Sequence, residues 1–145
     1  MKEYNFTDQD KHKFEENGVI ALEDFLSVEE CDKLRDECWR IVDEMDPMDH
    51  KTIFSTNNHE QMESDYLLGS SNKIRFFWEK EALDDSGMLR FPKHNALNKI
   101  GHALHLLSKP FKDATFSSNI KNILRNLDFI KPVIPQSMFI FKVTN

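Results

Sequence analysis

The sequence predicts an α+β fold, in which capped helices pack against a few short strands. Residues 27–46 repeat apolar side chains at helical spacing behind a capping serine. Residues 73–79 (KIRFFWE) alternate as a strand does, and residues 137–142 (SMFIFK) form an apolar run of strand character. The chain has 145 residues, 39% hydrophobic and 30% charged, and its 12 Phe need a core to cover them. One domain of ordinary size is therefore expected.

The first 50 residues predict two helices and a short strand. Thr7 can cap a helix over residues 7–17 that stops at Gly18, and residues 19–22 (VIAL) follow as a short apolar strand. Ser27 and Glu30 match a capping box for the long helix. Its apolar stripe comprises Cys31, Leu34, Cys38, Ile41, Val42 and Met45, and Pro47 ends it.

The rest of the chain predicts two further helices and the remaining strands. Residues 48–72 are polar, with loop signals at Asn57-Asn58 and at 69–72. After the strand at 73–79, a turn at 84–87 leads to residues 88–91 as a hairpin partner. Helices are expected over 96–107, ended by Pro110, and over 117–127. Four short strands do not close a sheet, and the terminal strand would then lie with its backbone groups unpaired.

Charge and cysteine content restrict partners and compartment. The net charge is −6, and the first 50 residues hold 16 Asp and Glu against 6 Lys and Arg, which argues against a nucleic-acid-binding arm. The more basic remainder could favour an anionic small molecule, although an ordinary solvated surface explains it more simply. Cys31 and Cys38 lie too far apart along one helix for a disulfide. No membrane-spanning run, signal peptide or peroxisomal Ser-Lys-Leu ending is visible, so a cytoplasmic location is expected.

The residues alone assemble no catalytic constellation. His102 and His105 stand three apart, a spacing that can suit a metal, but no third ligand accompanies them, and a pair of surface histidines is the better interpretation. No histidine is followed two places on by an acidic residue, as the start of an iron-binding facial triad would require. Nucleophile-elbow, phosphate-loop and Cys-x-x-Cys motifs are also missing from the sequence.

Several segments nevertheless resemble one family. EENGVIALEDFLSVEECDKL, then KIRFFWEK, NKIGHALH and QSMFIFK, in this order and spacing, resemble the phytanoyl-CoA dioxygenase (PhyH) family. The resemblance implies an oxidoreductase that uses Fe(II) and 2-oxoglutarate on a double-stranded β-helix (jelly-roll) fold, with an acyl-CoA as a possible substrate. It also implies that the His-x-Asp…His triad follows the strand at SMFIFK. Residues 1–145 are then the N-terminal part of one dioxygenase domain, with an incomplete barrel and no metal site, and inactive as this chain alone.

Two residues match family positions that contact 2-oxoglutarate, namely Lys99 and Met138. A Lys ammonium can pair with a carboxylate of the cosubstrate, and a Met thioether can pack on a small flat ligand. Without the resemblance, the helical phase of residues 96–107 places Lys99 on the solvated surface, and Met138 is one more core side chain. The alternative function is a non-catalytic regulatory or binding isoform, and the residues that follow Asn145 would distinguish the two. A third possibility, a helical adaptor protein unrelated to this family, would require that KIRFFWE and SMFIFK do not form strands.

Overall fold

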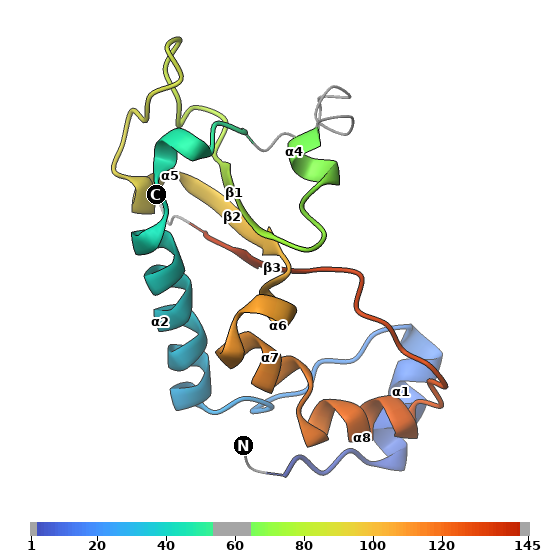
Figure 1. The fold of residues 1–145 in the computed structure, drawn as a ribbon. Coiled ribbons are helices and arrows are strands. Elements are labelled where there is room, and N and C mark those ends of the chain that lie inside the picture. The colour runs from blue at the N-terminus through green and yellow to red at the C-terminus, as the bar shows by residue number, and fades with distance from the viewer. Residues whose placement is uncertain (1–2, 54–64, 143–145) are drawn as a thin grey trace.

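The computed structural model describes residues 3–53 and 65–142, and Asn57, Asn58 and His59 lie outside this range. The elements follow one another as three strands with helices before, between and around them (Figure 1). In chain order they are α1 (Asp8–Asn17), α2 (Val28–Glu44), the 3-10 turn η1 (Pro47–Asp49), α4 (Asp65–Leu68), β1 (Ile74–Trp78), α5 (Lys93–Ala96), β2 (Leu97–His102), α6 (Leu104–Leu107), α7 (Lys109–Thr115), α8 (Ser118–Asn126) and β3 (Ser137–Ile140). The α+β prediction is confirmed at this level.

Local sequence signals set the ends of the first two helices. Thr7 caps α1 through the amide of Asp10, and Gly18 closes it in the left-handed conformation at φ 69°. Ser27 caps α2 in the expected capping box with Glu30. Both helices therefore begin and end within a residue or two of their predicted limits.

The three strands form one antiparallel sheet in the order β1-β2-β3. Phe77 lies opposite Lys99 on the central strand, and Lys99 lies opposite Ile140 on β3. The outer side of β1 is covered where Trp78 donates its amide to Thr52 and where the Tyr66 hydroxyl bonds the backbone of Phe76. β3 is therefore the edge at which a further strand could join the described sheet.

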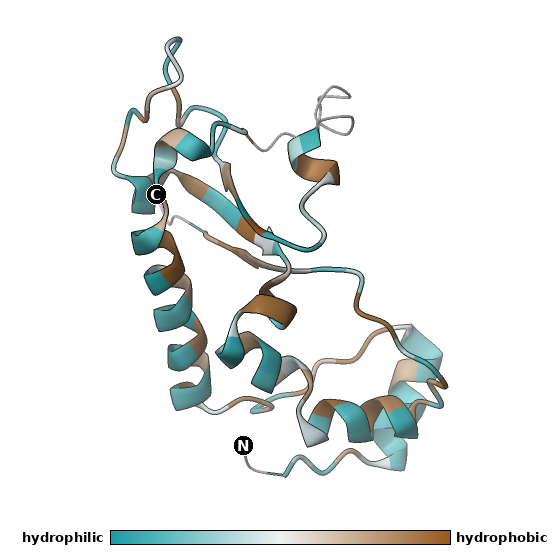
Figure 2. Cartoon of the chain, viewed as in Figure 1, coloured by the Kyte–Doolittle hydropathy of each residue, from teal (hydrophilic) through white to brown (hydrophobic). Residues whose placement is uncertain are grey.

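The main core lies between α2 and one face of the sheet. Figure 2 shows the apolar residues of α2 on the side that faces the sheet. Trp78, Leu97 and Ile100 are fully buried there, together with Cys38 and Val42 from α2. Phe77 is also fully buried but points away from this cluster, so the sheet carries side chains on both faces.

Four sequence predictions are wrong in part. Residues 19–22 form no strand, and Val19 is exposed. Residues 88–91 contribute one isolated bridge, between Leu83 and Leu89, and no strand. The segment 96–107 is not one helix: Leu97–His102 form the central strand β2, which buries Leu97 and Ile100 in the α2 core and Lys99 on the other face, and only Leu104–Leu107 are helical. Pro110 lies in the first turn of α7 (Lys109–Thr115) and does not end a helix.

The terminal strand is also better supported than the sequence suggested. β3 pairs with β2 over four residues, so its backbone is bonded along one edge, and the expectation that it has no strand to pair with is wrong. Phe141, just beyond β3, is buried and donates its amide to Asn98, whereas Ile140 is exposed. Residues 137–140 do form the strand that the sequence predicted.

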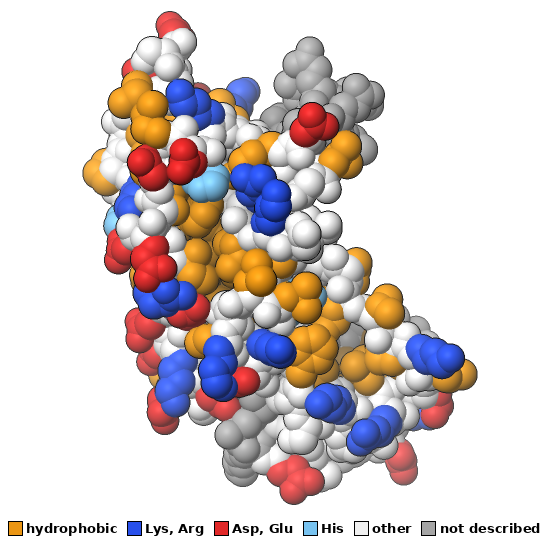
Figure 3. Space-filling model, in the orientation of Figure 1, with side chains coloured by type: hydrophobic (Ala, Val, Ile, Leu, Met, Phe, Trp, Pro, Cys, Tyr) orange, Lys and Arg blue, Asp and Glu red, His pale blue; other side chains and the backbone are white. Residues whose placement is uncertain are grey.

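Large apolar side chains remain exposed below the sheet. Figure 3 shows orange side chains gathered in the middle of this view, between the sheet and α8. Exposed apolar residues of α6 and of the segment that leads into β3 are Leu106, Leu107, Phe129, Ile130, Val133 and Ile134. Within the described ranges, no helix has both the length and the apolar character needed to cross a membrane.

Candidate functional site

The second face of the sheet gathers the polar side chains that sequence and structure single out. Paired residues of an antiparallel sheet point to the same side, as do residues two apart on a strand. The pairs Phe77–Lys99, Arg75–Gly101 and Gly101–Met138 therefore place Arg75, Lys99 and Met138 on one face. This face, called the Lys99 face below, is opposite the α2 core, and α4 lies on its side of the sheet (Figure 1).

Lys99 is buried, which corrects the surface position that its helical phase suggested. Only 6% of the residue is exposed, and its Nζ lies 5.2 Å from the centre of the Phe77 ring. Burial lowers the pKa of Lys99 from its usual value, because the ammonium loses hydration on this apolar face. A carboxylate bound nearby would restore favourable interactions to the charged form.

Met138 reaches the same face from the neighbouring strand. It is half-buried and lies diagonally across from Lys99, because its partner is Gly101 and Lys99 is two residues away on β2. A side chain at Gly101 would approach both the Cβ of Met138 and the carbonyl of Ser137 to 3.2 Å. The missing side chain of Gly101 thus lets β3 approach β2 closely and fixes where Met138 lies. The structure brings the two predicted cosubstrate contacts to one face.

Arg75 is a further cation on this face that the sequence interpretation did not select. Its guanidinium carbon lies 4.5 Å from the centre of the Tyr66 ring, and its buried Nε has no hydrogen-bond partner in the described part of the chain. Tyr66 is held by His50, whose Nδ1 lies 2.7 Å from the hydroxyl. Arg75 and Phe77 are two residues apart in the alternating segment 73–79, so the sequence could have indicated that both side chains point to the same face of the sheet.

His102 and His105 are both buried, so the surface pair expected from the sequence is wrong. His102 is 5% exposed and its Nδ1 lies 2.7 Å from the Ser70 hydroxyl. His105 is 3% exposed and bonds Ser137 at the same distance. Each imidazole has a serine partner of its own. A shared surface position would require residues 96–107 to form one helix, and they do not.

The described residues do not fit a metal site. Within residues 3–53 and 65–142, no three His, Cys, Asp or Glu side chains come together as ligands. The chemistry that this part of the chain does fit is that of a carboxylate ligand, since the Lys99 face combines two cations and a buried donor without a partner. We therefore assign no iron ligand to these residues.

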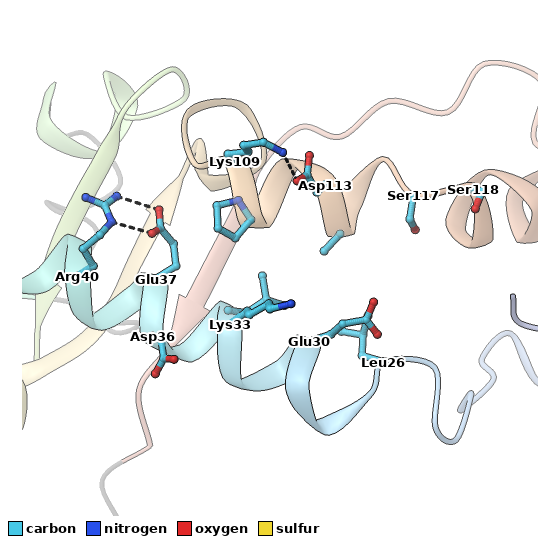
Figure 4. Close-up of a pocket in the computed structure, with 13 residues that line it drawn as sticks. Leu26, Glu30, Lys33, Asp36, Glu37, Arg40, Lys109, Asp113, Ser117 and Ser118 are labelled. Atoms are coloured by element: carbon cyan, nitrogen blue, oxygen red, sulfur yellow. Dashed lines mark hydrogen bonds and ion pairs between the residues drawn. The ribbon is translucent and has the colours of Figure 1, made fainter. Parts of the chain in front are cut away.

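A cavity of about 810 Å³ lies elsewhere, between α2 and α7 (Figure 4). Its charged residues are largely paired with one another, as Arg40 is with Glu37 at 2.7 Å and Lys109 with Asp113 at 2.5 Å. Neither Lys99 nor Met138 lines it. Because its charged residues already pair with one another, this cavity offers few free charges to a ligand.

The family signal spans most of the chain. The sequence profile of the family described as Phytanoyl-CoA dioxygenase (PhyH) matches residues 14–145. Phytanoyl-CoA dioxygenase domain-containing protein 1 of Danio rerio is 48% identical over 141 residues, which cover 94% of this chain and 48% of the relative. The chain belongs to the phytanoyl-CoA dioxygenase family.

Other relatives agree across distant organisms. Phytanoyl-CoA dioxygenase domain-containing protein 1 of Mus musculus is 42% identical over 90% of this chain and 46% of the relative. Phytanoyl-CoA dioxygenase 1 of Oryza sativa subsp. japonica is 37% identical over 95% of this chain and 48% of the relative. The chain spans about half the length of the curated relatives it matches.

Proposed function

We propose that the chain forms part of an Fe(II)- and 2-oxoglutarate-dependent dioxygenase and contributes the Lys99 face to cosubstrate binding. The observation that carries the proposal is the burial of Lys99 beside Phe77, with Arg75 and Met138 on the same face. An ammonium on this face can form a charge-assisted hydrogen bond with a carboxylate ligand. Family membership makes 2-oxoglutarate the first dicarboxylate to test.

In this proposal Lys99 pairs with a carboxylate of 2-oxoglutarate, and the Met138 thioether packs on the flat oxo-acid. The aromatic ring of Phe77 forms the floor and excludes water, which strengthens the ion pair. The substrate to be hydroxylated is left open. Because the rice relative is named phytanoyl-CoA dioxygenase 1, acyl-CoA thioesters are the first class of substrate to screen.

The test uses the methyl signal of Met138. The chain is labelled at methionine methyl carbons, the Met138 signal is assigned by Met138→Leu, and 2-oxoglutarate is titrated to tens of millimolar. We expect the Met138 signal to shift saturably, and Lys99→Gln to weaken the apparent affinity by about 10-fold or more. Lys121→Gln, at an exposed lysine of α8, is the matched control. A Met138 signal that does not respond would refute the cosubstrate contact.

A second function, a non-catalytic 2-oxoglutarate-responsive binding protein, is favoured by one observation. The Lys99 face offers carboxylate contacts, whereas the described residues bring no three metal ligands together. Binding without turnover is the expected property of such a face. We expect no succinate above background from this chain with Fe(II), ascorbate and 2-oxoglutarate, and steady succinate release would overturn the expectation.

A further inference from the structure

His102 has a defined tautomer because of the groups around Ser70. The Ser70 hydroxyl donates its single proton to the carbonyl of Leu67. It can therefore only accept from His102, whose Nδ1 lies 2.7 Å away and must carry a proton. In the neutral imidazole, Nε2 is then left with its lone pair, and Nε2 has no hydrogen-bond partner among the described residues.

The ring also lies against Phe77 of the Lys99 face, although the pairing of His102 with Ile74 gives its strand position to the opposite face. Its centre lies 5.4 Å from that of Phe77, the same ring that Lys99 lies over at 5.2 Å. Ser70 is held in turn by backbone hydrogen bonds to Leu67 and from Lys73. The imidazole is thus pre-oriented next to the predicted carboxylate contact.

We propose that His102 is a further contact for the carboxylate ligand of the Lys99 face, and that it takes up a proton on Nε2 when the ligand binds. The inference rests on the proposed function, since it assumes a carboxylate beside Lys99. The proton comes from solvent, and the resulting N–H donates to a carboxylate oxygen. Lys99 and His102, which both lie close to the Phe77 ring, would then bind the same ligand.

The charges around His102 in the structure support a coupling between ligand binding and proton uptake. Burial and the neighbouring Lys99 both lower the pKa of His102 from its usual value, so the imidazole is neutral near pH 7. Other titratable groups around this face include Arg75 on β1, Tyr66 on α4 and His50, whose Nδ1 lies 2.7 Å from the Tyr66 hydroxyl. A bound carboxylate reverses the sign of the local field and favours the imidazolium, so its affinity should rise as the pH falls.

The test follows the Cε1–H signal of His102 by NMR during a pH titration of the chain, with and without saturating 2-oxoglutarate. We expect the pKa of His102 to rise by about one unit or more with ligand. A rise of one unit corresponds to a gain in affinity that approaches about tenfold once the pH lies below the pKa values of both the free and the bound state. His105 is the matched control, because it is equally buried and serine-bonded, and its signal should be the same with and without the ligand. Sodium chloride at equal ionic strength controls for general anion effects.

A variant separates this proton uptake from a structural role. In His102→Asn, the amide can still donate to Ser70 but nothing remains at the position of Nε2. We expect this variant to lose the pH dependence of 2-oxoglutarate binding, because an asparagine side chain takes up no proton in this pH range. If 2-oxoglutarate shifts the Met138 methyl signal and leaves the pKa of His102 unchanged, this inference fails and the proposed function stands. If the Met138 signal does not respond either, both fail.

Discussion

Gly101→Ala tests the packing that brings Met138 to the Lys99 face. The added Cβ would lie 3.2 Å from both the Cβ of Met138 and the carbonyl oxygen of Ser137, tighter than an ordinary contact. Both atoms belong to or lie close to the β3 backbone, so relief requires that the strand moves by a few tenths of an ångström. Overpacking of this kind costs about 1–3 kcal/mol. We expect a loss of stability in that range, which for a domain of this size is about 4 °C in Tm per kcal/mol.

The assay combines urea denaturation with hydrogen exchange followed by mass spectrometry. Exchange in Gly101→Ala should increase more in residues 136–142 than in α2, because the clash weakens the pairing of β3 with β2. Gly18→Ala is the control, since it strains a left-handed residue at φ 69° far from the sheet and should leave β3 exchange unchanged relative to α2. A variant as stable as the wild type, with unchanged β3 exchange, would refute the close approach.

Three further predictions concern local features. The Phe141 amide donates to the carbonyl of Asn98, so the alternation of an antiparallel pair directs the Phe139 N–H toward β2 and the Met138 N–H away from it. Residue-resolved hydrogen exchange should therefore be slower at Phe139 than at Met138 by about tenfold or more. Equal rates would contradict the register. Burial raises the pKa of the Cys38 thiol to about 12, so iodoacetamide at pH 8 should modify Cys31 first, and faster labelling of Cys38 in the native protein would disprove its burial. Ser27→Ala should lower the free energy of unfolding by about 1 kcal/mol in urea, and no change would show that the cap of α2 contributes nothing.

Elements with strong local signals were predictable from the sequence. Capping residues and a period of 3.6 define α2 and α8 without tertiary information, and the alternation around Phe76 defines β1. The strand at residues 137–140 was predicted as well, although not its pairing with β2. Pairing depends on contacts distant in sequence, which local periodicity does not report.

The central strand shows why the site was harder to predict. Leu97, Ile100 and Leu104 recur at spacings that fit a helix, yet β2 is buried on both faces, and a strand of this kind loses its simple alternation. The misassigned helix placed Lys99 and His102 on the surface, so the residues alone gave no reason to choose them. Lys99 and Met138 were found through family resemblance, and the buried environment that accounts for Lys99 became visible only in the sheet.

The central claim is that Lys99 contacts 2-oxoglutarate in a complete enzyme of this family. The most direct measurement is the KM for 2-oxoglutarate, by succinate release, in a chimera that continues residue 145 with the remainder of the Danio rerio relative. Losing a charge-assisted contact costs about 1.5–3 kcal/mol, so Lys99→Gln should raise KM about 10- to 150-fold, while Lys121→Gln leaves it unchanged. An unchanged KM in a folded, active Lys99→Gln chimera would contradict the account.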